Sequence, residues 1–303
     1  MAELITSVQN PKIKKLLALQ QKSSERRESG LFVVEGQREL QHCIDAGYEI
    51  DSIFVDASRF GDSPQGSSLR STLPTYPASR QCGTCLRRVP PTSRGRGLAT
   101  SPEGSPEPTV HSAKIFEVSP EVYEKIAYRG STEGVIAEVK AVQRGLEDVK
   151  LSEQPLVIVL ESVEKPGNLG AVLRSADAAG ADAVIVCDPL TDLYNPNLIR
   201  SSIGAIFTKQ VVACPSEDAI SWLKANDIQI LTAQLQDSEW YYDTDMRRGT
   251  AIVMGTESTG LTRIWRDAAD AHIKIPMLGA LDSLNVSVSA AILLFEAVRQ
   301  RNA

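Results

Sequence analysis

The chain has 303 residues, which is long enough to bury a sizeable core and suggests two domains rather than one. Its net charge of −6 and its pI near 5.3 exclude a uniformly basic nucleic-acid-binding surface and leave only a local basic patch. The longest apolar runs are strand-sized and the first residues lack an apolar signal region, so we expect no membrane span and a cytoplasmic protein.

The first predicted helix begins at Pro11 with Asn10 as its cap, and Ile13, Leu16 and Leu17 form its apolar face. Basic side chains gather on and just after this helix. They are Lys12, Lys14, Lys15, Lys22, Arg26 and Arg27. On charge alone, such a cluster is equally consistent with a solvated helix face and with a contact to RNA.

Strands and helices then alternate through the first part of the chain. The predicted elements are a strand at 31–34, a helix at 36–46, strands at 50–55 and 115–118, a helix capped by Ser119 with Pro120 at its first position, and a strand at 135–139. This order is typical of a small α/β domain, which we place at residues 1–141.

Residues 57–112 interrupt this pattern. The segment holds half of the sixteen prolines and contains neither a lysine nor an isoleucine. It cannot bury enough apolar area to offset the entropy of ordering, so we predict a disordered loop. Two hypotheses account for the segment: an arginine-bearing insertion that touches RNA, or a stretch read in a displaced frame. The abrupt change in residue usage favours the second hypothesis.

The five cysteines are scattered along the chain. Cys82 and Cys85 form a single CxxC without a second pair, whereas a structural zinc site needs about four ligands. We therefore expect free thiols and no metal.

A polar linker at 142–154 separates the first domain from a second, at 155–303. Its predicted strands lie at 156–160, 183–187, 211–213, 228–232 and 251–254, with helices at 168–179, 197–203 and 219–225 between them. Apolar strands separated by helices predict a parallel sheet covered on both faces.

The last fifty residues carry the chemistry. Strands at 251–254 and 273–275 each end in a loop rich in Gly, Ser and Thr, and the second loop leads into an apolar helix beginning near Asn285. Backbone amides in such loops suit a polar or anionic ligand. The loop GTESTGLT has the two glycines of a phosphate loop, but Leu261 stands where that motif needs a lysine, which argues against an ATPase.

Three sequence elements together resemble a known family. GTESTGL from Gly255, IPM from Ile275 and SLNVSVSAA from Ser283 are similar to the second and third motifs of the SpoU/TrmH group of RNA ribose 2′-O-methyltransferases. Asn168, Gly170 and Arg174 supply the first motif. The resemblance implies a knotted SPOUT-type methyltransferase domain, preceded by a ribosomal-protein-like domain that binds RNA. It also implies S-adenosylmethionine as the cofactor and a homodimer formed through the knotted region.

The resemblance also assigns site residues. The cofactor is expected to lie between loops at 232–236, 255–261 and 275–285. The residues expected to hold it are Leu235, Gly255, Gly260, Leu261, Ile275, Met277 and Leu284. Those expected to serve catalysis are Asn168, Arg174, Glu257, Ser283 and Asn285. Those expected to contact RNA are Lys12, Lys14, Lys15, Arg26, Arg27 and Arg38. Without the motifs, Ile275 and Leu284 would be interpreted as core residues and Asn285 as a helix cap.

Arg174 follows Asn168 by six residues, a spacing nearer two helical turns than one, so we expect both side chains on roughly one side of their helix. An ordinary arginine stays protonated, which favours a grip on the RNA phosphate and stabilisation of the developing alkoxide over base catalysis. Glu257 would pair with Arg174 or with a basic group of a second subunit. The expected substrate is ribosomal RNA, with transfer RNA as the alternative substrate. The alternative class of protein is a non-catalytic RNA-binding assembly factor.

Overall fold

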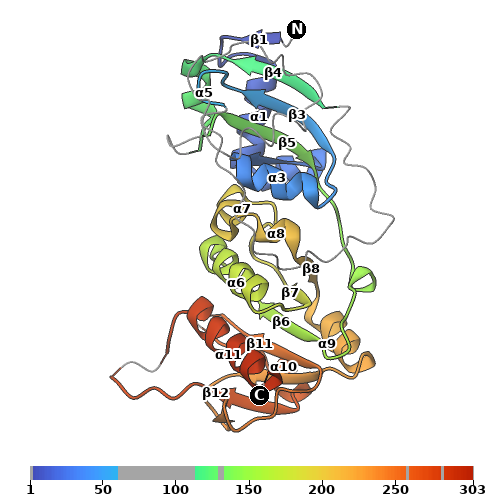
Figure 1. The fold of residues 1–303 in the computed structure, drawn as a ribbon. Coiled ribbons are helices and arrows are strands. Elements are labelled where there is room, and N and C mark those ends of the chain that lie inside the picture. Colours follow the sequence, from blue (N-terminus) through green and yellow to red (C-terminus); the bar gives the residue numbers. More distant parts are fainter. Residues whose placement is uncertain (1–2, 61–112, 129–132, 257–258, 281–282, 303) are drawn as a thin grey trace, which may run out of the picture.

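A computed structural model of the chain describes residues 3–60, 113–128, 133–256, 259–280 and 283–302. Within these ranges the chain forms two α/β regions, each built on its own sheet and placed one above the other in Figure 1. None of the helices that the structure describes is long and apolar enough to cross a membrane. Glu257, Cys82 and Cys85 lie outside the described residues.

The N-terminal region carries a five-stranded sheet of order β1-β4-β3-β5-β2. Strands β1 and β3 run parallel to β4, whereas β5 runs antiparallel to both β3 and β2. Helices α1 and α5 pack on one face and α3 on the other. The elements are β1 (Glu3–Ile5), α1 (Pro11–Gln21), α2 (Ser23–Ser29), β2 (Leu31–Glu35), α3 (Gln37–Asp45), β3 (Ile50–Val55), β4 (Lys114–Val118), α5 (Pro120–Ile126) and β5 (Val135–Lys140).

The predicted helix starts of this region are confirmed. The Asn10 side chain accepts a hydrogen bond from the Lys12 amide at 2.9 Å, and Ser119 accepts one from the Val122 amide at 3.4 Å. Strand β1 and helix α2 were missed, because both are short and lack a clear apolar period.

The segment predicted to be disordered from residue 57 begins inside the fold. Residues 57–60 form a turn in which the Phe60 amide bonds to the Asp56 carbonyl, and the Phe60 side chain is buried in the core. Residues 61–112 lie outside the described residues.

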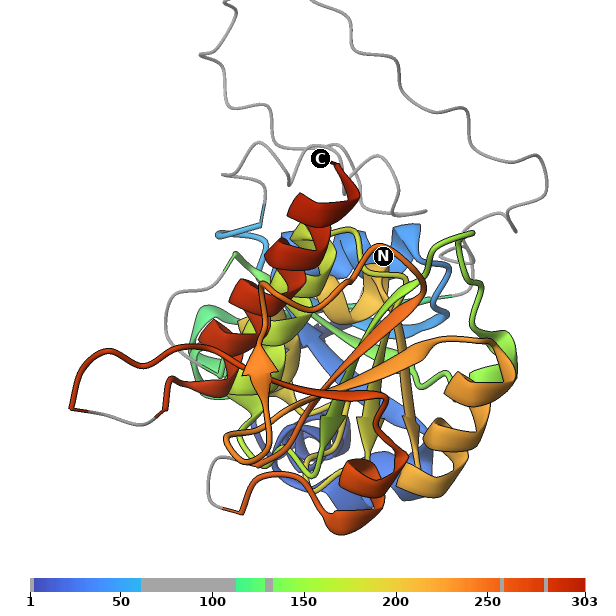
Figure 2. The ribbon, with the colours of Figure 1, turned by 90° about the horizontal axis from the view of Figure 1, so that it is seen from below.

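The C-terminal region confirms the prediction of a parallel sheet covered on both faces. Its seven strands all run parallel, in the order β10-β12-β9-β11-β6-β7-β8. Alternate side chains point to opposite faces, so Leu156, Ile158 and Leu160 of β6 pack beneath α6 and α11, whereas Val157 and Val159 pack beneath α9 and α10. Figure 2 shows α11 lying beside α6 on one side of the sheet, with α9 and α10 on the other.

The bounds of these elements follow the predicted periods closely. They are β6 (Leu156–Glu161), α6 (Pro166–Ala178), β7 (Ala183–Cys187), α7 (Pro196–Ser202), α8 (Ala205–Thr208), β8 (Gln210–Cys214), α9 (Ser216–Ala225), β9 (Gln229–Ala233), β10 (Glu239–Trp240), β11 (Thr250–Met254), α10 (Arg263–Ala268), β12 (Ala271–Lys274) and α11 (Val286–Arg301). The short elements α8, α10 and β10 were missed. Between the two sheets, residues 142–154 contain a 3₁₀ turn at Leu146–Asp148.

The two regions share one continuous hydrophobic core. Phe32 of β2 stacks on Tyr194 with ring centroids 4.2 Å apart, and its ring also meets Phe207 of α8 at 5.9 Å. Close by in the fold, the Arg26 guanidinium of α2 pairs with the Asp192 carboxylate at 2.5 Å and donates to the carbonyls of Leu19 and Gln20. These contacts join the first region to the second through buried side chains.

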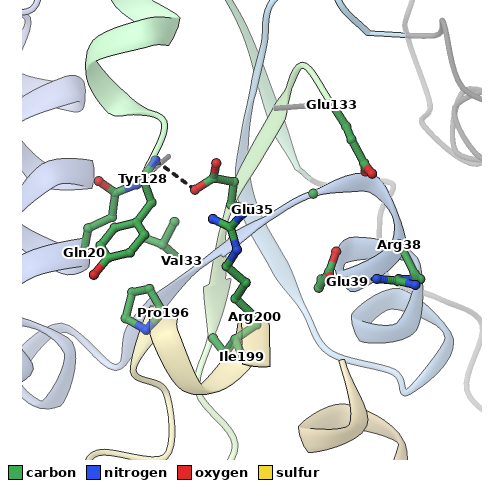
Figure 3. Close-up of a pocket in the computed structure, with 11 residues that line it drawn as sticks. Gln20, Val33, Glu35, Arg38, Glu39, Tyr128, Glu133, Pro196, Ile199 and Arg200 are labelled. Atoms are coloured by element: carbon green, nitrogen blue, oxygen red, sulfur yellow. Dashed lines mark hydrogen bonds and ion pairs between the residues drawn. The ribbon is translucent and has the colours of Figure 1, made fainter. Parts of the chain in front are cut away.

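A cavity of about 530 Å³ lies at this junction, between β2, α3 and α7. Charged side chains from both regions line it, among them Glu35 and Arg38 from the first and Arg200 from the second (Figure 3).

Loss of the Arg26 guanidinium should destabilise the fold. Arg26 is only 5% exposed and Asp192 only 16%, so Arg26→Ala leaves a poorly hydrated carboxylate without its partner, at a cost of about 3 to 5 kcal/mol. Thermal and urea denaturation of the full chain measure the loss. Arg27→Ala, on the exposed side of the same helix, is the matched control and should change stability by less than about 0.5 kcal/mol. Equal effects of the two substitutions would contradict a structural role for the Arg26–Asp192 pair.

Candidate functional site

A cavity of about 700 Å³ opens beside the carboxyl ends of β9, β11 and β12. All seven residues predicted to hold the cofactor line it, and so do Ser283 and Asn285. Leu235 and Leu284 are half exposed, at 50% and 41%, so neither is an ordinary core residue. The cavity therefore brings together residues from three loops far apart in the sequence.

The direction of the strands explains why these loops meet. Strand β11 pairs in parallel with β9 on one side and β6 on the other, and β9 pairs in parallel with β12. The loops that follow parallel strands leave the sheet at one edge, where α/β proteins commonly bind their ligands.

The loop after β11 folds back tightly on itself. Thr256 and Gly260 form an antiparallel bridge, and Gly260 has a positive φ of 67°. A Cβ atom at Gly255 would lie 2.3 Å from the Gly260 carbonyl group, so only glycine fits there. The loop's own backbone approaches Gly255 closely, so the requirement for glycine does not depend on a bound ligand.

A buried carboxylate fixes the far end of this loop. Glu161, the last residue of β6, is 3% exposed and accepts hydrogen bonds from the Thr262 amide at 2.9 Å and the Thr262 hydroxyl at 2.5 Å. Glu161 could not be predicted from its residue type, because a glutamate at a strand end is usually solvated.

The first and third motifs meet at Asn168. The Asn285 side-chain amide donates to the Asn168 side-chain oxygen at 3.2 Å, while the Asn285 oxygen caps α11 by accepting from the Ser287 amide at 2.9 Å. Asn285 is thus both a helix cap and a bridge between motifs. Asn168 lines a smaller cavity of about 120 Å³, which shares Gly255 and Thr256 with the large one.

Arg174 lies elsewhere on α6. Its side chain is exposed, it lines neither cavity, and no hydrogen bond or ion pair joins it to another described residue. The expectation that it shares one side of the helix with Asn168 is wrong, because six residues at 100° each fall about 120° short of two full turns. Arg174 is therefore directed at the surroundings of this chain rather than into the cavity.

Several polar side chains of the large cavity were not predicted, among them Gln234, Arg266 and Lys274. The Gln234 side-chain oxygen is buried and has no hydrogen-bond partner among the described residues, although its amide group donates to the Gln236 carbonyl at 3.0 Å. Arg266 and Lys274 add positive charge to the lining. Gln234 falls within the predicted 232–236 loop, but nothing in its residue type distinguished it.

Comparison with known proteins identifies the family of this site. Residues 155–295 match the model of the SpoU rRNA Methylase family, and residues 10–82 match the MRM3-like substrate binding domain. The 23S rRNA (guanosine-2′-O-)-methyltransferase RlmB of Bordetella pertussis is 35% identical over 204 residues, which cover 62% of this chain and 79% of the relative. The chain belongs to the SpoU rRNA methylase family.

Solved structures of similar proteins extend the likeness over the whole chain. The crystal structure of an RNA 2′-O ribose methyltransferase superposes with a TM-score of 0.76 at 34% identity, covering 99% of this chain and 100% of that one. The AdoMet-bound rRNA methyltransferase of Sinorhizobium meliloti superposes with a TM-score of 0.79 at 25% identity, with 98% of both chains covered. Both sheets of this SpoU-family protein therefore have counterparts in these two solved structures.

The residues predicted to contact RNA divide into a first group with ion-pair partners at 2.8 Å or less and a second group without such close partners. Arg26 is buried in the Asp192 pair, so its assignment to RNA is wrong. Lys12 pairs with Glu3 at 2.6 Å, and Lys15 pairs with the buried Glu138 at 2.8 Å. The second group consists of the exposed residues Lys14, Arg27 and Arg38. Of these three, only Arg38 has an ion-pair partner among the described residues, Glu39 at 3.7 Å.

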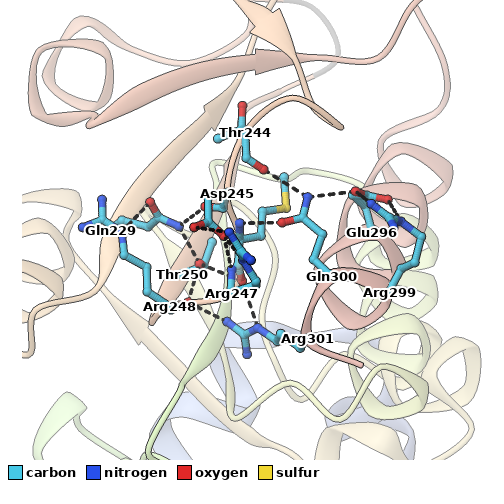
Figure 4. Close-up of polar contacts among 11 residues, drawn as sticks. Gln229, Thr244, Asp245, Arg247, Arg248, Thr250, Glu296, Arg299, Gln300 and Arg301 are labelled. Atoms are coloured by element: carbon cyan, nitrogen blue, oxygen red, sulfur yellow. Dashed lines mark hydrogen bonds and ion pairs between the residues drawn. The ribbon is translucent and has the colours of Figure 1, made fainter. Parts of the chain in front are cut away.

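Helix α11, whose start carries the third motif, is anchored at its far end. Arg301, the last residue of α11, donates to the carbonyls of Gln154, Pro155, Met246 and Arg248 at 2.7 to 3.1 Å. Its neighbour Gln300 bonds to the backbone of the 244–246 segment, and Figure 4 shows this network between α11 and the loop before β11. The anchor fixes the position of α11, and hence of Asn285 at its start.

Gly255→Ala should weaken ligand binding in the large cavity. The added methyl group clashes with the Gly260 carbonyl at 2.3 Å and forces the 255–261 loop out of place. Isothermal titration with S-adenosylmethionine should show at least a roughly tenfold weaker affinity, a loss of about 1.4 kcal/mol. Gly167→Ala, on α6, is the matched control, because nothing lies within 4 Å of its added Cβ and Gly167 does not line the cavity. Unchanged binding by Gly255→Ala would contradict the role of this loop.

Proposed function

We propose that this chain transfers a methyl group from S-adenosylmethionine to a ribose 2′-hydroxyl of ribosomal RNA. The observation that carries the proposal is the convergence of the three motifs, in which Gly255, Ile275 and Asn285 line one cavity and Asn285 bonds to Asn168. Relatives of this chain that are named 23S rRNA 2′-O-methyltransferases support the choice of substrate.

The cavity fits the chemistry of the cofactor. Leu235, Ile275 and Met277 offer apolar surface to an adenine ring. The Gln234 oxygen, which has no partner among the described residues, offers an acceptor to an N–H or O–H donor of the adenosine moiety. Lys274 and Arg266 offer positive charge to a carboxylate. When bound, S-adenosylmethionine supplies an electrophilic methyl group on its sulfonium centre.

The residues of the first motif act on the RNA. Methyl transfer requires a ribose hydroxyl held in line with the methyl group, an acceptor for the proton that this hydroxyl loses, and a favourable place for the charge that forms on its oxygen. Arg174, exposed and without a partner among the described residues, is free to hold an RNA phosphate and to stabilise the developing alkoxide. Asn168 and Asn285 fix the geometry between motifs, and we assign Glu257 to pairing with Arg174 or with a basic group of a second subunit.

The N-terminal region, residues 1–141, is proposed to dock the RNA, with residues 142–154 as its linker to the methyltransferase domain at 155–303. The match of residues 10–82 to a substrate-binding domain supports this division. Lys14, Arg27 and Arg38 are the exposed cations available for phosphate contacts.

A homodimer formed through α11 completes the proposal. Val288 and Phe295 are each 47% exposed and lie seven residues apart, so both project from one face of the helix. Leu284, 41% exposed, extends this apolar surface toward the cofactor cavity. A second copy of the chain would bury these side chains and bring its own residues next to the site. The knot implied by the family resemblance stays a prediction for this region.

Labelled methyl transfer tests the reaction. Wild-type protein given radiolabelled S-adenosylmethionine and unmodified ribosomal RNA should place label on ribose, as nucleoside analysis will show. Arg174→Ala should lower kcat by about 10²- to 10³-fold, the usual effect of removing a group that stabilises an oxyanion, without weakening cofactor binding. Arg263→Ala, at a 90% exposed position on α10, is the control and should transfer at the wild-type rate.

Two outcomes would redirect the proposal. Label appearing in transfer RNA but not in ribosomal RNA would change the substrate. Absence of label with intact cofactor binding would replace the enzyme with a non-catalytic RNA-binding factor.

Phe295→Arg tests the dimer. A charge on the apolar face of α11 opposes burial of that face, so sedimentation should show a monomer where the wild type is a dimer. The melting temperature of the single chain should change little, because Phe295 is exposed there. Leu4→Arg, at a similarly exposed apolar position on β1, should remain a dimer. A dimeric Phe295→Arg protein would exclude this face as the interface.

A further inference from the structure

The cavity between the two regions of the chain is separate from the cofactor site. Its volume is about 530 Å³, and none of the residues that line it also lines the cofactor cavity. It is formed by β2 and the start of α3 on one side and by α7 on the other. Stacking of Phe32 on Tyr194 and the Arg26–Asp192 pair hold these elements together.

Most of the charges in this cavity are already satisfied. The Glu133 carboxylate accepts from the Gln37 amide at 2.5 Å and thereby caps the start of α3. Glu39, with a side chain only 12% exposed, lies 3.7 Å from the Arg38 guanidinium. Two groups of opposite charge remain, Glu35 and Arg200.

Glu35 is a half-buried carboxylate with unused acceptor capacity. One of its oxygens accepts from the Tyr128 amide at 3.0 Å, and no cation lies within ion-pair distance of it among the described residues. Burial raises the pKa of Glu35 above its ordinary value, and the charge of Arg200 acts in the opposite direction. Figure 3 shows the Arg200 side chain extending toward Glu35 from α7.

Arg200 and Tyr128 offer two further kinds of contact. The Arg200 guanidinium is exposed and donates no hydrogen bond to a described residue, so all five of its N–H donors remain available. The Tyr128 ring is 41% exposed and lies near Val33, Pro196 and Ile199, which give this end of the cavity an apolar character. An acceptor, a donor and an exposed aromatic ring thus surround one space.

We propose that this cavity binds one unpaired guanine base of the RNA substrate, which anchors the RNA apart from the nucleotide that is methylated. Glu35 accepts from the N1–H and N2–H groups of guanine, Arg200 donates to the O6 acceptor, and the Tyr128 ring stacks on the base. Arg38, 48% exposed at the rim, is placed for a neighbouring phosphate. The assignment to RNA rests on the proposed function.

The paired charges select this ligand. Guanine is the one common RNA base whose pairing edge presents two adjacent N–H donors beside an acceptor, which matches a carboxylate beside a guanidinium. A basic side chain of a partner protein would satisfy Glu35 but would be repelled by Arg200. A free phosphate would satisfy Arg200 but would be repelled by Glu35.

Titration of the full chain with mononucleotides tests the site. Saturating S-adenosylmethionine is present throughout, so that the cofactor cavity is occupied. Guanosine 5′-monophosphate should bind more tightly than the adenosine, cytidine and uridine monophosphates, and Glu35→Gln should weaken its binding by roughly 5- to 150-fold. Glutamine keeps an acceptor for the Tyr128 amide, so the fold should survive; Arg200→Gln is the second test. Glu28→Gln, an exposed position on α2, should bind like the wild type.

Several results would overturn the inference. Equal affinity for the four mononucleotides, no binding of guanosine 5′-monophosphate, or full affinity in both Glu35→Gln and Arg200→Gln would each do so. In methyl transfer, Glu35→Gln should raise the KM for RNA and leave the affinity for S-adenosylmethionine unchanged. Selective guanine binding without methyl transfer would refute the proposed function alone, whereas normal transfer with an unchanged KM would refute the guanine site alone.

Discussion

The parallel direction of β6, β9, β11 and β12 is the constraint on which the rest of the structure depends. Parallel strands end at the same edge, so loops that are separated by up to about a hundred residues in the sequence converge on one place. Hydrogen bonds then fix their relative positions. Glu161 ties the end of β6 to Thr262, and Asn168 meets Asn285. The large cavity is a consequence of strand direction first and of side-chain chemistry second.

A second constraint comes from the junction between the two regions. The core runs without interruption from the N-terminal sheet into the C-terminal one, through aromatic rings and the buried Arg26–Asp192 pair. A basic side chain used in this way is not available to a ligand, whereas the cations Lys14, Arg27 and Arg38 are exposed. Fixing the two regions together also creates the cavity that contains Glu35 and Arg200. The same packing therefore decides both the stability of the junction and the surface offered to a substrate.

Helix α11 combines three roles along its length. Its start carries the third motif, with Asn285 as cap and as partner of Asn168. Its middle buries one face against α6 and the sheet and leaves Val288 and Phe295 exposed. Its end is fixed by Arg301, which satisfies four backbone carbonyls. A helix held at both ends keeps Asn285 in a fixed position relative to Asn168.

The sequence by itself determined the features that depend on near neighbours. Apolar periods located the longer strands and helices, and Asn10, Ser119 and Asn285 marked helix starts. The motif residues that were expected to lie together do line one cavity. Only the tertiary structure decided that Arg26 is buried, that Glu161 holds the 255–262 loop and that Arg174 lies outside the cavity. Each of these depends on partners or on a direction in space that local spacing does not specify; Arg26 and Asp192, for example, are 166 residues apart. The sequence does not show whether a charged side chain faces water or a buried counter-charge, because that depends on which residues the fold brings next to it.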